Sequence, residues 1–216
     1  MKVIDLTQKI SEEMPVFPGT EPAKLEIVNT YEKDGFRETL FHISSHTGTH
    51  MDAPYHLFSE RTKLDEMAAA QFVGTALVID CRDVAAGEEI GMERIRAVGA
   101  LAEKAEFLLF CTGWDRHWGT EAYFGTYPVI SKEICQYLLD SGKKGVGFDT
   151  IGIDPVAEMA LPRHHQLLSQ RDMVIIENLT HLEKVGQELF LLAALPLHYQ
   201  DADGAPVRAV AVLKET

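Results

Sequence analysis

The chain has 216 residues, enough for one globular domain or at most two small ones, and we expect a single domain over residues 1–216. Apolar residues make up 46% and charged residues 25%, which excludes a disordered or collagen-like chain. Twenty Lys and Arg against 33 Asp and Glu give a formal charge of −13, so we expect no nucleic-acid-binding surface.

Neither the cysteines nor the N-terminal residues indicate export. The chain has three cysteines, an odd number, and no C-x-x-C pair: Cys81, Cys111 and Cys135. We therefore expect them to be reduced thiols. Asp5 interrupts the first apolar run, which a signal peptide would keep intact. The most apolar stretch, residues 189–197, is far shorter than the ~20 residues that cross a bilayer. We therefore expect a cytoplasmic protein without a membrane segment.

Short apolar segments rich in β-branched residues recur along the chain and predict strands. They lie at residues 25–28, 39–43, 76–80, 107–111, 145–148, 173–176, 189–193 and 207–213. Helical periodicity predicts helices over 92–104, from Ser131 to near Gly142, and over 162–170. Because the first strands follow one another without a helix, we expect an α/β domain with a mixed sheet.

Histidines concentrate in one short segment. Four of the nine lie within residues 42–56, where an even distribution would place fewer than one. In an extended chain, the alternate side chains of His46, His50 and Asp52 share one face, and Gly48 leaves room for an ion between them. We expect a strand that ends at Pro54, or a strand that passes into a turn.

Two imidazoles and a carboxylate form an open metal site for Zn²⁺, Mn²⁺ or Fe²⁺. A structural zinc site would need a fourth protein ligand, and no cysteine is near. The open position indicates chemistry, with His56 close by as a group that can exchange protons.

A second group of polar residues lies in the predicted helix at 162–170 and in the strand that follows it. Glu177 ends an apolar strand, where a carboxylate is costly unless it is paired or binds a cation. Either His164 or His165 could add an imidazole, and the spacing does not choose between them. The acids Asp201 and Asp203 are most simply part of a solvated turn.

Residues 46–56 fit the pattern H-x-G-T-H-x-D-x-P-x-H and resemble the metal-dependent cyclase-like family of bacterial kynurenine formamidases and isatin hydrolases. The resemblance covers the whole chain. It includes the segments at 4–7, 14–19, 112–114, 147–149 and 204–208.

The resemblance implies a role for each matching residue. His46, His50 and Asp52 would bind a first metal ion, and His165 and Glu177 would complete a second site that shares Asp52. His56 would be the proton donor and acceptor. It also implies a compact α/β domain with a barrel-like sheet flanked by helices, and an assembly of two or four copies.

The aromatic residues of the expected pocket depart from the family in one place. Phe17 stands where the formamidases carry Trp, and it offers less area and no indole N–H. Trp114 is a second aromatic candidate for substrate contact, and packing in the core is an equally good interpretation of it.

These observations predict a metal-dependent hydrolase of a small amide, with one or two Zn²⁺ or Mn²⁺ ions per chain. The expected substrate is an aryl formamide such as N-formylkynurenine, attacked by metal-bound hydroxide with His56 as proton shuttle. The alternatives are hydrolysis of a lactam or cyclic imide such as isatin, and a metal- or small-molecule-binding protein without catalysis.

Overall fold

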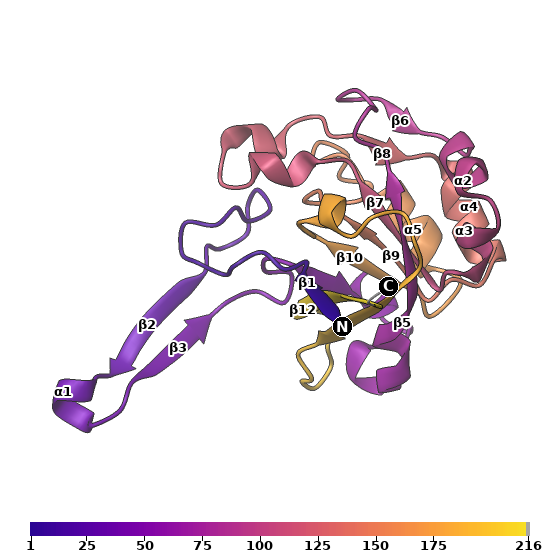
Figure 1. Ribbon diagram of the computed structural model, residues 1–216. Coiled ribbons are helices and arrows are strands. Elements are labelled where there is room, and N and C mark those ends of the chain that lie inside the picture. Colours follow the sequence, from indigo (N-terminus) through magenta and orange to yellow (C-terminus); the bar gives the residue numbers. More distant parts are fainter. Residues whose placement is uncertain (215–216) are drawn as a thin grey trace.

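The computed structural model describes residues 1–214, and within them seven strands close into a barrel (Figure 1). In order around the barrel these are β4 (His50–Asp52), β12 (Gly204–Leu213), β11 (Phe190–Pro196), β5 (Val73–Asp80), β7 (Phe107–Cys111), β9 (Gly145–Phe148) and β10 (Val174–Glu177). β5, β7, β9 and β10 are parallel neighbours, whereas the other pairs are antiparallel. β1 (Lys2–Asp5) pairs with β12 beyond the end of β4. The predicted mixed, barrel-like α/β fold is confirmed.

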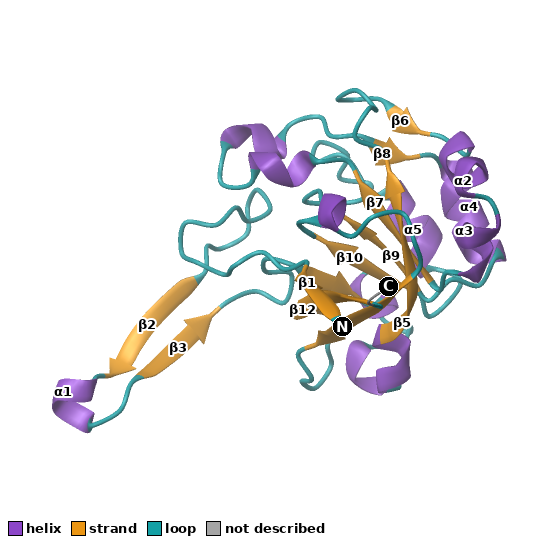
Figure 2. Ribbon diagram, in the orientation of Figure 1, coloured by secondary structure: helices purple, strands orange, loops and turns teal. Residues whose placement is uncertain are grey.

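Helices cover the outer face of the parallel strands (Figure 2). They are α2 (Glu93–Val98), α3 (Ala100–Lys104), α4 (Lys132–Asp140) and α5 (Pro162–Leu168). The short strands β6 (Glu89–Ile90) and β8 (Val129–Ile130) pair with each other above them. Single 3₁₀ turns are η1 (Pro54–His56), η2 (Leu64–Glu66), η3 (Ala69–Phe72), η4 (Trp114–His117), η5 (Glu121–Phe124) and η6 (Leu182–Lys184). Across residues 1–214, none of the helices has the length and apolar character needed to cross a bilayer.

The structure divides one of the predicted helices and confirms the start of another. The helix predicted over 92–104 is divided, because Gly99 adopts φ +53 between α2 and α3. The helix predicted from Ser131 begins as expected, since the Ser131 hydroxyl accepts a hydrogen bond from the Ile134 amide at 3.3 Å.

The barrel separates two apolar cores because successive side chains of a strand point to opposite faces. On β7, Phe107 and Leu109 fill the interior, whereas Leu108 and Phe110 pack outward against the helices. On β10 the same alternation places Ile176 inside and Glu177 outside, facing the helix side. This outer face of the barrel carries the polar residues described below.

A hairpin projects away from the barrel (Figure 1). It consists of β2 (Lys24–Asn29), α1 (Tyr31–Asp34) and β3 (Glu38–His42), and none of the residues in these elements is buried. Six of its large side chains are 43–67% exposed: Ile27, Val28, Tyr31, Phe36, Leu40 and Phe41. We call residues 24–42 the arm.

Candidate metal centre

The register between β4 and β10 brings the first polar residues together. Glu177 lies opposite His50, and Ile175 opposite Asp52, so His50, Asp52 and Glu177 share the outer face while Met51 and Ile176 fill the interior. The His50 Nε2 atom lies 3.4 Å from Asp52 Oδ1 and 3.5 Å from Glu177 Oε2. All three residues are buried.

His46 reaches this face by a turn and not by a continuous strand. β4 begins only at His50, and Gly48 adopts φ +64, so the predicted alternation along residues 46–50 is wrong. The Gly48 carbonyl accepts hydrogen bonds from His50 Nδ1 and Asn178 Nδ2, both at 2.8 Å, which fixes the turn against the end of β10. The turn still places His46 Nδ1 2.7 Å from Asp52 Oδ1.

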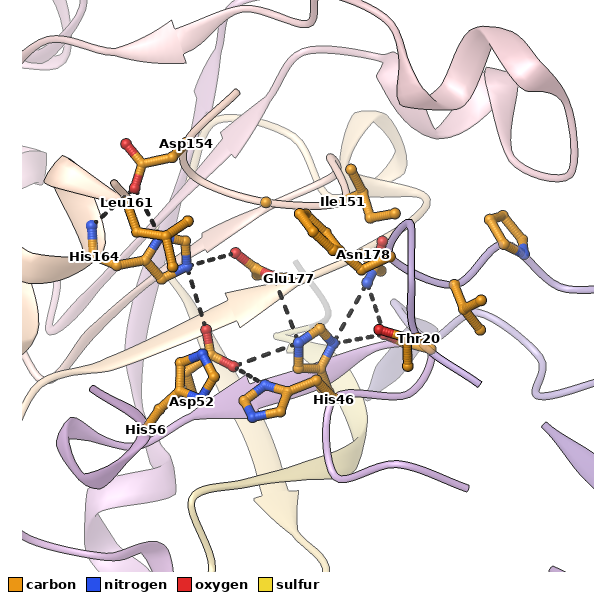
Figure 3. Close-up of a pocket in the computed structure, with 16 residues that line it drawn as sticks. Thr20, His46, Asp52, His56, Ile151, Asp154, Leu161, His164, Glu177 and Asn178 are labelled. Carbon is orange, nitrogen blue, oxygen red and sulfur yellow. Dashed lines mark hydrogen bonds and ion pairs between the residues drawn. The ribbon is translucent and has the colours of Figure 1, made fainter. Parts of the chain in front are cut away.

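The imidazole nearest Glu177 belongs to His164, and the prediction that His165 completes the set is corrected. His164 Nε2 lies 3.2 Å from Glu177 Oε1 and 3.6 Å from Asp52 Oδ2 (Figure 3). His165 is exposed on the opposite side of α5 and packs edge-on against Phe58. The buried face of a helix carries residues three and four apart, and His164 shares it with Leu167 and Leu168.

Each of the three imidazoles binds an outer acceptor through one nitrogen and turns the other toward the central carboxylates. His50 Nδ1 bonds the Gly48 carbonyl, His164 Nδ1 bonds Asp154 Oδ2 at 2.8 Å, and His46 Nε2 bonds Asp203 Oδ2 at 3.0 Å. Metal-binding histidines are commonly oriented by such outer partners. Three sets of ligand atoms lie within 4.8 Å of one another: His46, His50 and Asp52; Asp52, His164 and Glu177; and His46, His56 and Asp203. The first two sets could hold one ion each, with Asp52 shared.

The charge of the site also fits a cation. Asp52 and Glu177 are 1% and 5% exposed, and across the described chain their ion pairs involve only imidazoles. Burial opposes the charged form of His46, but Asp52 and Asp203 outweigh it and raise the pKa of His46 to about 10. Against the same effect of burial, Asp154, Asp52 and Glu177 raise the pKa of His164 well above its usual range. The carboxylates thus attract positive charge that a divalent ion would supply.

A cavity of about 280 Å³ opens onto these residues. Its walls are mostly apolar, and they include Pro15, Val16, Phe17, Ile151 and Leu161. Phe17, which the sequence predicts to contact the substrate, is among the residues that line this cavity. The combination of apolar walls with a polar floor is typical of a small-molecule site.

Trp114 is not among the residues that line this cavity, so its predicted contact with substrate is corrected. The ring is 8% exposed, its Nε1 donates to the Tyr123 carbonyl at 3.0 Å, and it packs in a cluster with Tyr127 and Ile151. Trp114 thus packs against Ile151, which lines the cavity, without lining the cavity itself.

His56 lies at the edge of the same cavity. It is carried by η1, which Pro54 begins, and its ring stands 4.1 Å from the ring of His46. Burial lowers the pKa of His56 below the usual 6.5, although Asp52 opposes this effect. The ring is therefore mostly neutral at pH 7, as a group that accepts a proton must be.

Sequence reasoning missed two carboxylates of the site. Asp154 accepts hydrogen bonds from the amides of Arg163 and His164 as well as from the His164 ring. Asp203, expected in a solvated turn, contacts His46. The chain separations of 10 and 157 residues leave no local pattern for either contact, although the helical face of His164 could have selected that histidine over His165.

Comparison with known proteins decides the family. The family model named "Cyclase" and described as "Putative cyclase" matches residues 4–155. The kynurenine formamidase of Bacillus cytotoxicus is 33% identical over 208 residues, which cover 96% of this chain and 95% of that protein. The chain belongs to the cyclase family.

Solved structures of other proteins share the fold. Isatin hydrolase A from Labrenzia aggregata, bound to benzyl benzoate, superposes with a TM-score of 0.88 at 25% identity, over 99% of this chain and 94% of that one. A potential metal-dependent hydrolase with cyclase activity superposes with a TM-score of 0.77 at 27% identity, over 97% and 98% of the two chains. The similarity thus extends over the barrel, the pocket and the arm.

Proposed function

We propose that this cyclase-family protein is a metal-dependent hydrolase of a small amide, and that its substrate is an aryl formamide such as N-formylkynurenine. The observation that carries the proposal is the orientation of three imidazoles, each anchored outside and directed at the buried carboxylates Asp52 and Glu177. The similarity to kynurenine formamidases supports the substrate class.

The ligands proposed for Zn²⁺ or Mn²⁺, in one or two ions per chain, are His46, His50, Asp52, His164 and Glu177. Imidazole and carboxylate suit both metals. A bound divalent ion polarises an acyl carbonyl and lowers the pKa of water. The protein itself would position the substrate. Phe17 and Leu161 line the cavity and would contact the apolar part of the substrate, next to the polar ligand residues. His56, neutral at the edge of the cavity, would accept a proton from water and return it to the departing amine.

A lactam or cyclic imide is the second candidate substrate, because the fold superposes on isatin hydrolase A over 99% of this chain. The same ligands and the same proton acceptor would serve this reaction, since both substrates lose a carbon–nitrogen bond. A binding protein without catalysis is less well supported, because it would not need a free imidazole at His56. We also propose that the protein acts in the cytoplasm.

An assembly of two or four copies is proposed as well, and the arm supports it. An isolated two-stranded hairpin is marginally stable in water, and the arm has six exposed large apolar side chains without a covering layer from its own chain. A second copy would supply that layer. Exposed Val3, Leu191, Leu195 and Leu197 on the barrel offer it an apolar surface.

A substrate panel tests the activity. Metal-loaded protein is assayed with N-formylkynurenine, a simple aryl formamide, isatin and a cyclic imide. We expect hydrolysis of the formamides, and we expect His56→Ala to lower kcat about 100- to 10,000-fold while the metal content stays unchanged. The control His198→Ala removes an exposed imidazole outside the cavity. Absence of turnover across the panel, or equal activity of His56→Ala and wild type, would contradict the proposal.

A further inference from the structure

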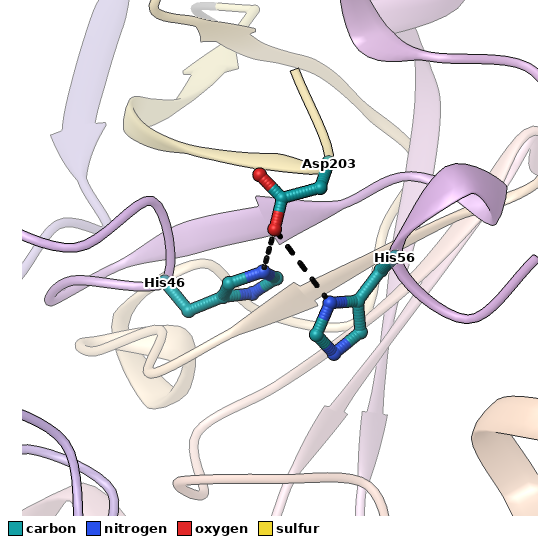
Figure 4. Close-up of side chains that lie close together, drawn as sticks. All are labelled: His46, His56 and Asp203. Carbon is teal, nitrogen blue, oxygen red and sulfur yellow. Dashed lines mark hydrogen bonds and ion pairs between the residues drawn. The ribbon is translucent and has the colours of Figure 1, made fainter. Parts of the chain in front are cut away.

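Asp203 joins two histidines that have different tasks. It lies just before β12 and places Oδ2 3.0 Å from His46 Nε2 and 3.8 Å from His56 Nδ1 (Figure 4). One carboxylate oxygen thus faces both a proposed metal ligand and the proposed proton acceptor. Asp203 is partly exposed, and its carboxylate groups with His46 and His56 rather than with either ligand set that contains Asp52.

The position of this carboxylate is fixed by its neighbours. The Tyr199 hydroxyl lies 3.1 Å from Oδ1 and 2.5 Å from the Gly204 carbonyl, so its one hydrogen is shared between them. The Ser45 hydroxyl donates to Oδ2 at 3.2 Å, and the backbone carbonyl of Asp203 accepts from the Ala53 amide at 2.9 Å. The next residue is Gly204, where a Cβ would lie 2.5 Å from the His46 ring. Glycine therefore lets β12 approach the ring closely enough for Asp203 to reach Nε2.

The other two imidazoles of the site show what such a contact does. His50 and His164 each donate from Nδ1 to a fixed oxygen, and this leaves Nε2 directed at the carboxylates. In His46 the arrangement is inverted, because Nε2 meets Asp203 and Nδ1 faces Asp52. The outer acceptor decides which nitrogen carries the hydrogen and which presents its lone pair.

We propose that Asp203 is a positioning residue of the reaction, which turns His46 Nδ1 toward the metal and holds the His56 ring beside it. The inference rests on the proposed function, because it assigns the contact a purpose only if His46 binds a metal. It predicts that loss of the carboxylate affects both metal binding and turnover, through two different histidines.

Calorimetric titration of metal-stripped protein with Zn²⁺ alone tests the first effect. We expect Asp203→Asn to weaken Zn²⁺ binding about 10- to 100-fold, as outer partners of metal ligands commonly do. The matched control is Asp201→Asn, two residues earlier, where the carboxylate pairs with Lys63 and asparagine tolerates the φ of +60. The control is expected to bind Zn²⁺ like wild type.

Kinetics at saturating metal test the second effect. We expect Asp203→Asn to lower kcat at least about tenfold with KM within about twofold of wild type, because His56 loses its fixed neighbour while the apolar walls are untouched. A general loss of structure would change KM and the unfolding midpoint together. Where Asp203→Asn does not fold, Tyr199→Phe removes one of the hydroxyls that hold the carboxylate, and we expect it to lower kcat several-fold.

The outcomes separate the two claims. Wild-type protein that binds no Zn²⁺ would overturn the proposed function and this inference with it. If wild-type protein binds Zn²⁺ and folded Asp203→Asn has the same Zn²⁺ affinity and the same kcat as wild type, the inference alone would be overturned. If that variant does not fold, unchanged affinity and kcat in Tyr199→Phe would do the same.

Discussion

Two contacts orient each imidazole of the candidate metal centre, namely those of His46, His50 and His164. One nitrogen contacts an outer acceptor, and the other faces Asp52 or Glu177. His164 and His165 are adjacent in sequence, yet only His164 has both contacts. The family resemblance implied His165, whereas the structure places the His164 ring beside Glu177. The helical face selects His164, since it lies three and four residues before Leu167 and Leu168, whose side chains are fully buried.

This pair gives a matched test at the scale of one residue. We expect His164→Ala to lower both metal content and kcat/KM, the latter by at least about 100-fold, because it removes a ligand rather than an outer partner. We expect His165→Ala to retain both within about twofold, because its side chain is exposed. Elemental analysis and steady-state kinetics measure the two quantities. Greater damage from His165→Ala would reverse the assignment.

At the scale of elements, local patterns predicted most strands but not their partners. The predicted strands at 25–28 and 39–43 exist as β2 and β3, and they form the exposed arm instead of joining the barrel. Of the strand that the sequence predicted to end at Pro54, only the three residues of β4 form one, and they carry His50 and Asp52. β4 nevertheless closes the barrel through pairs with both β10 and β12. Such long-range pairings leave no trace in local periodicity.

The arm yields a prediction about assembly. Phe41 is 61% exposed on β3, and in an assembly of two copies its burial would contribute about 1.5–3 kcal/mol. We expect wild type to sediment with the mass of at least two chains, and Phe41→Asp to shift it toward one. Met159→Asp is the control, since it introduces the same charge at a residue that is 76% exposed and outside the arm. A wild-type monomer, or no response to Phe41→Asp, would contradict the proposed assembly.

At the scale of the whole molecule, the site depends on segments that are distant in sequence. The 46–56 segment, β10, α5 and the turn before β12 each contribute at least one polar side chain. The 46–56 motif alone predicted the kind of chemistry, because it contains two of the proposed histidine ligands, a carboxylate and His56, the proposed proton acceptor. Asp154 and Asp203 could not be predicted, because the loop before α5 brings Asp154 to His164 and the pairing of β12 with β4 brings Asp203 to His46.

The central claim is that a divalent ion bound by this assembled set is required for amide hydrolysis. The most direct measurement is the rate of N-formylkynurenine hydrolysis while metal-stripped protein is titrated with Zn²⁺ or Mn²⁺. We predict negligible activity without metal, and recovery that saturates at one or two ions per chain. Activity that survives complete metal removal, or metal binding that restores no hydrolysis of formamide, lactam or imide, would contradict the account.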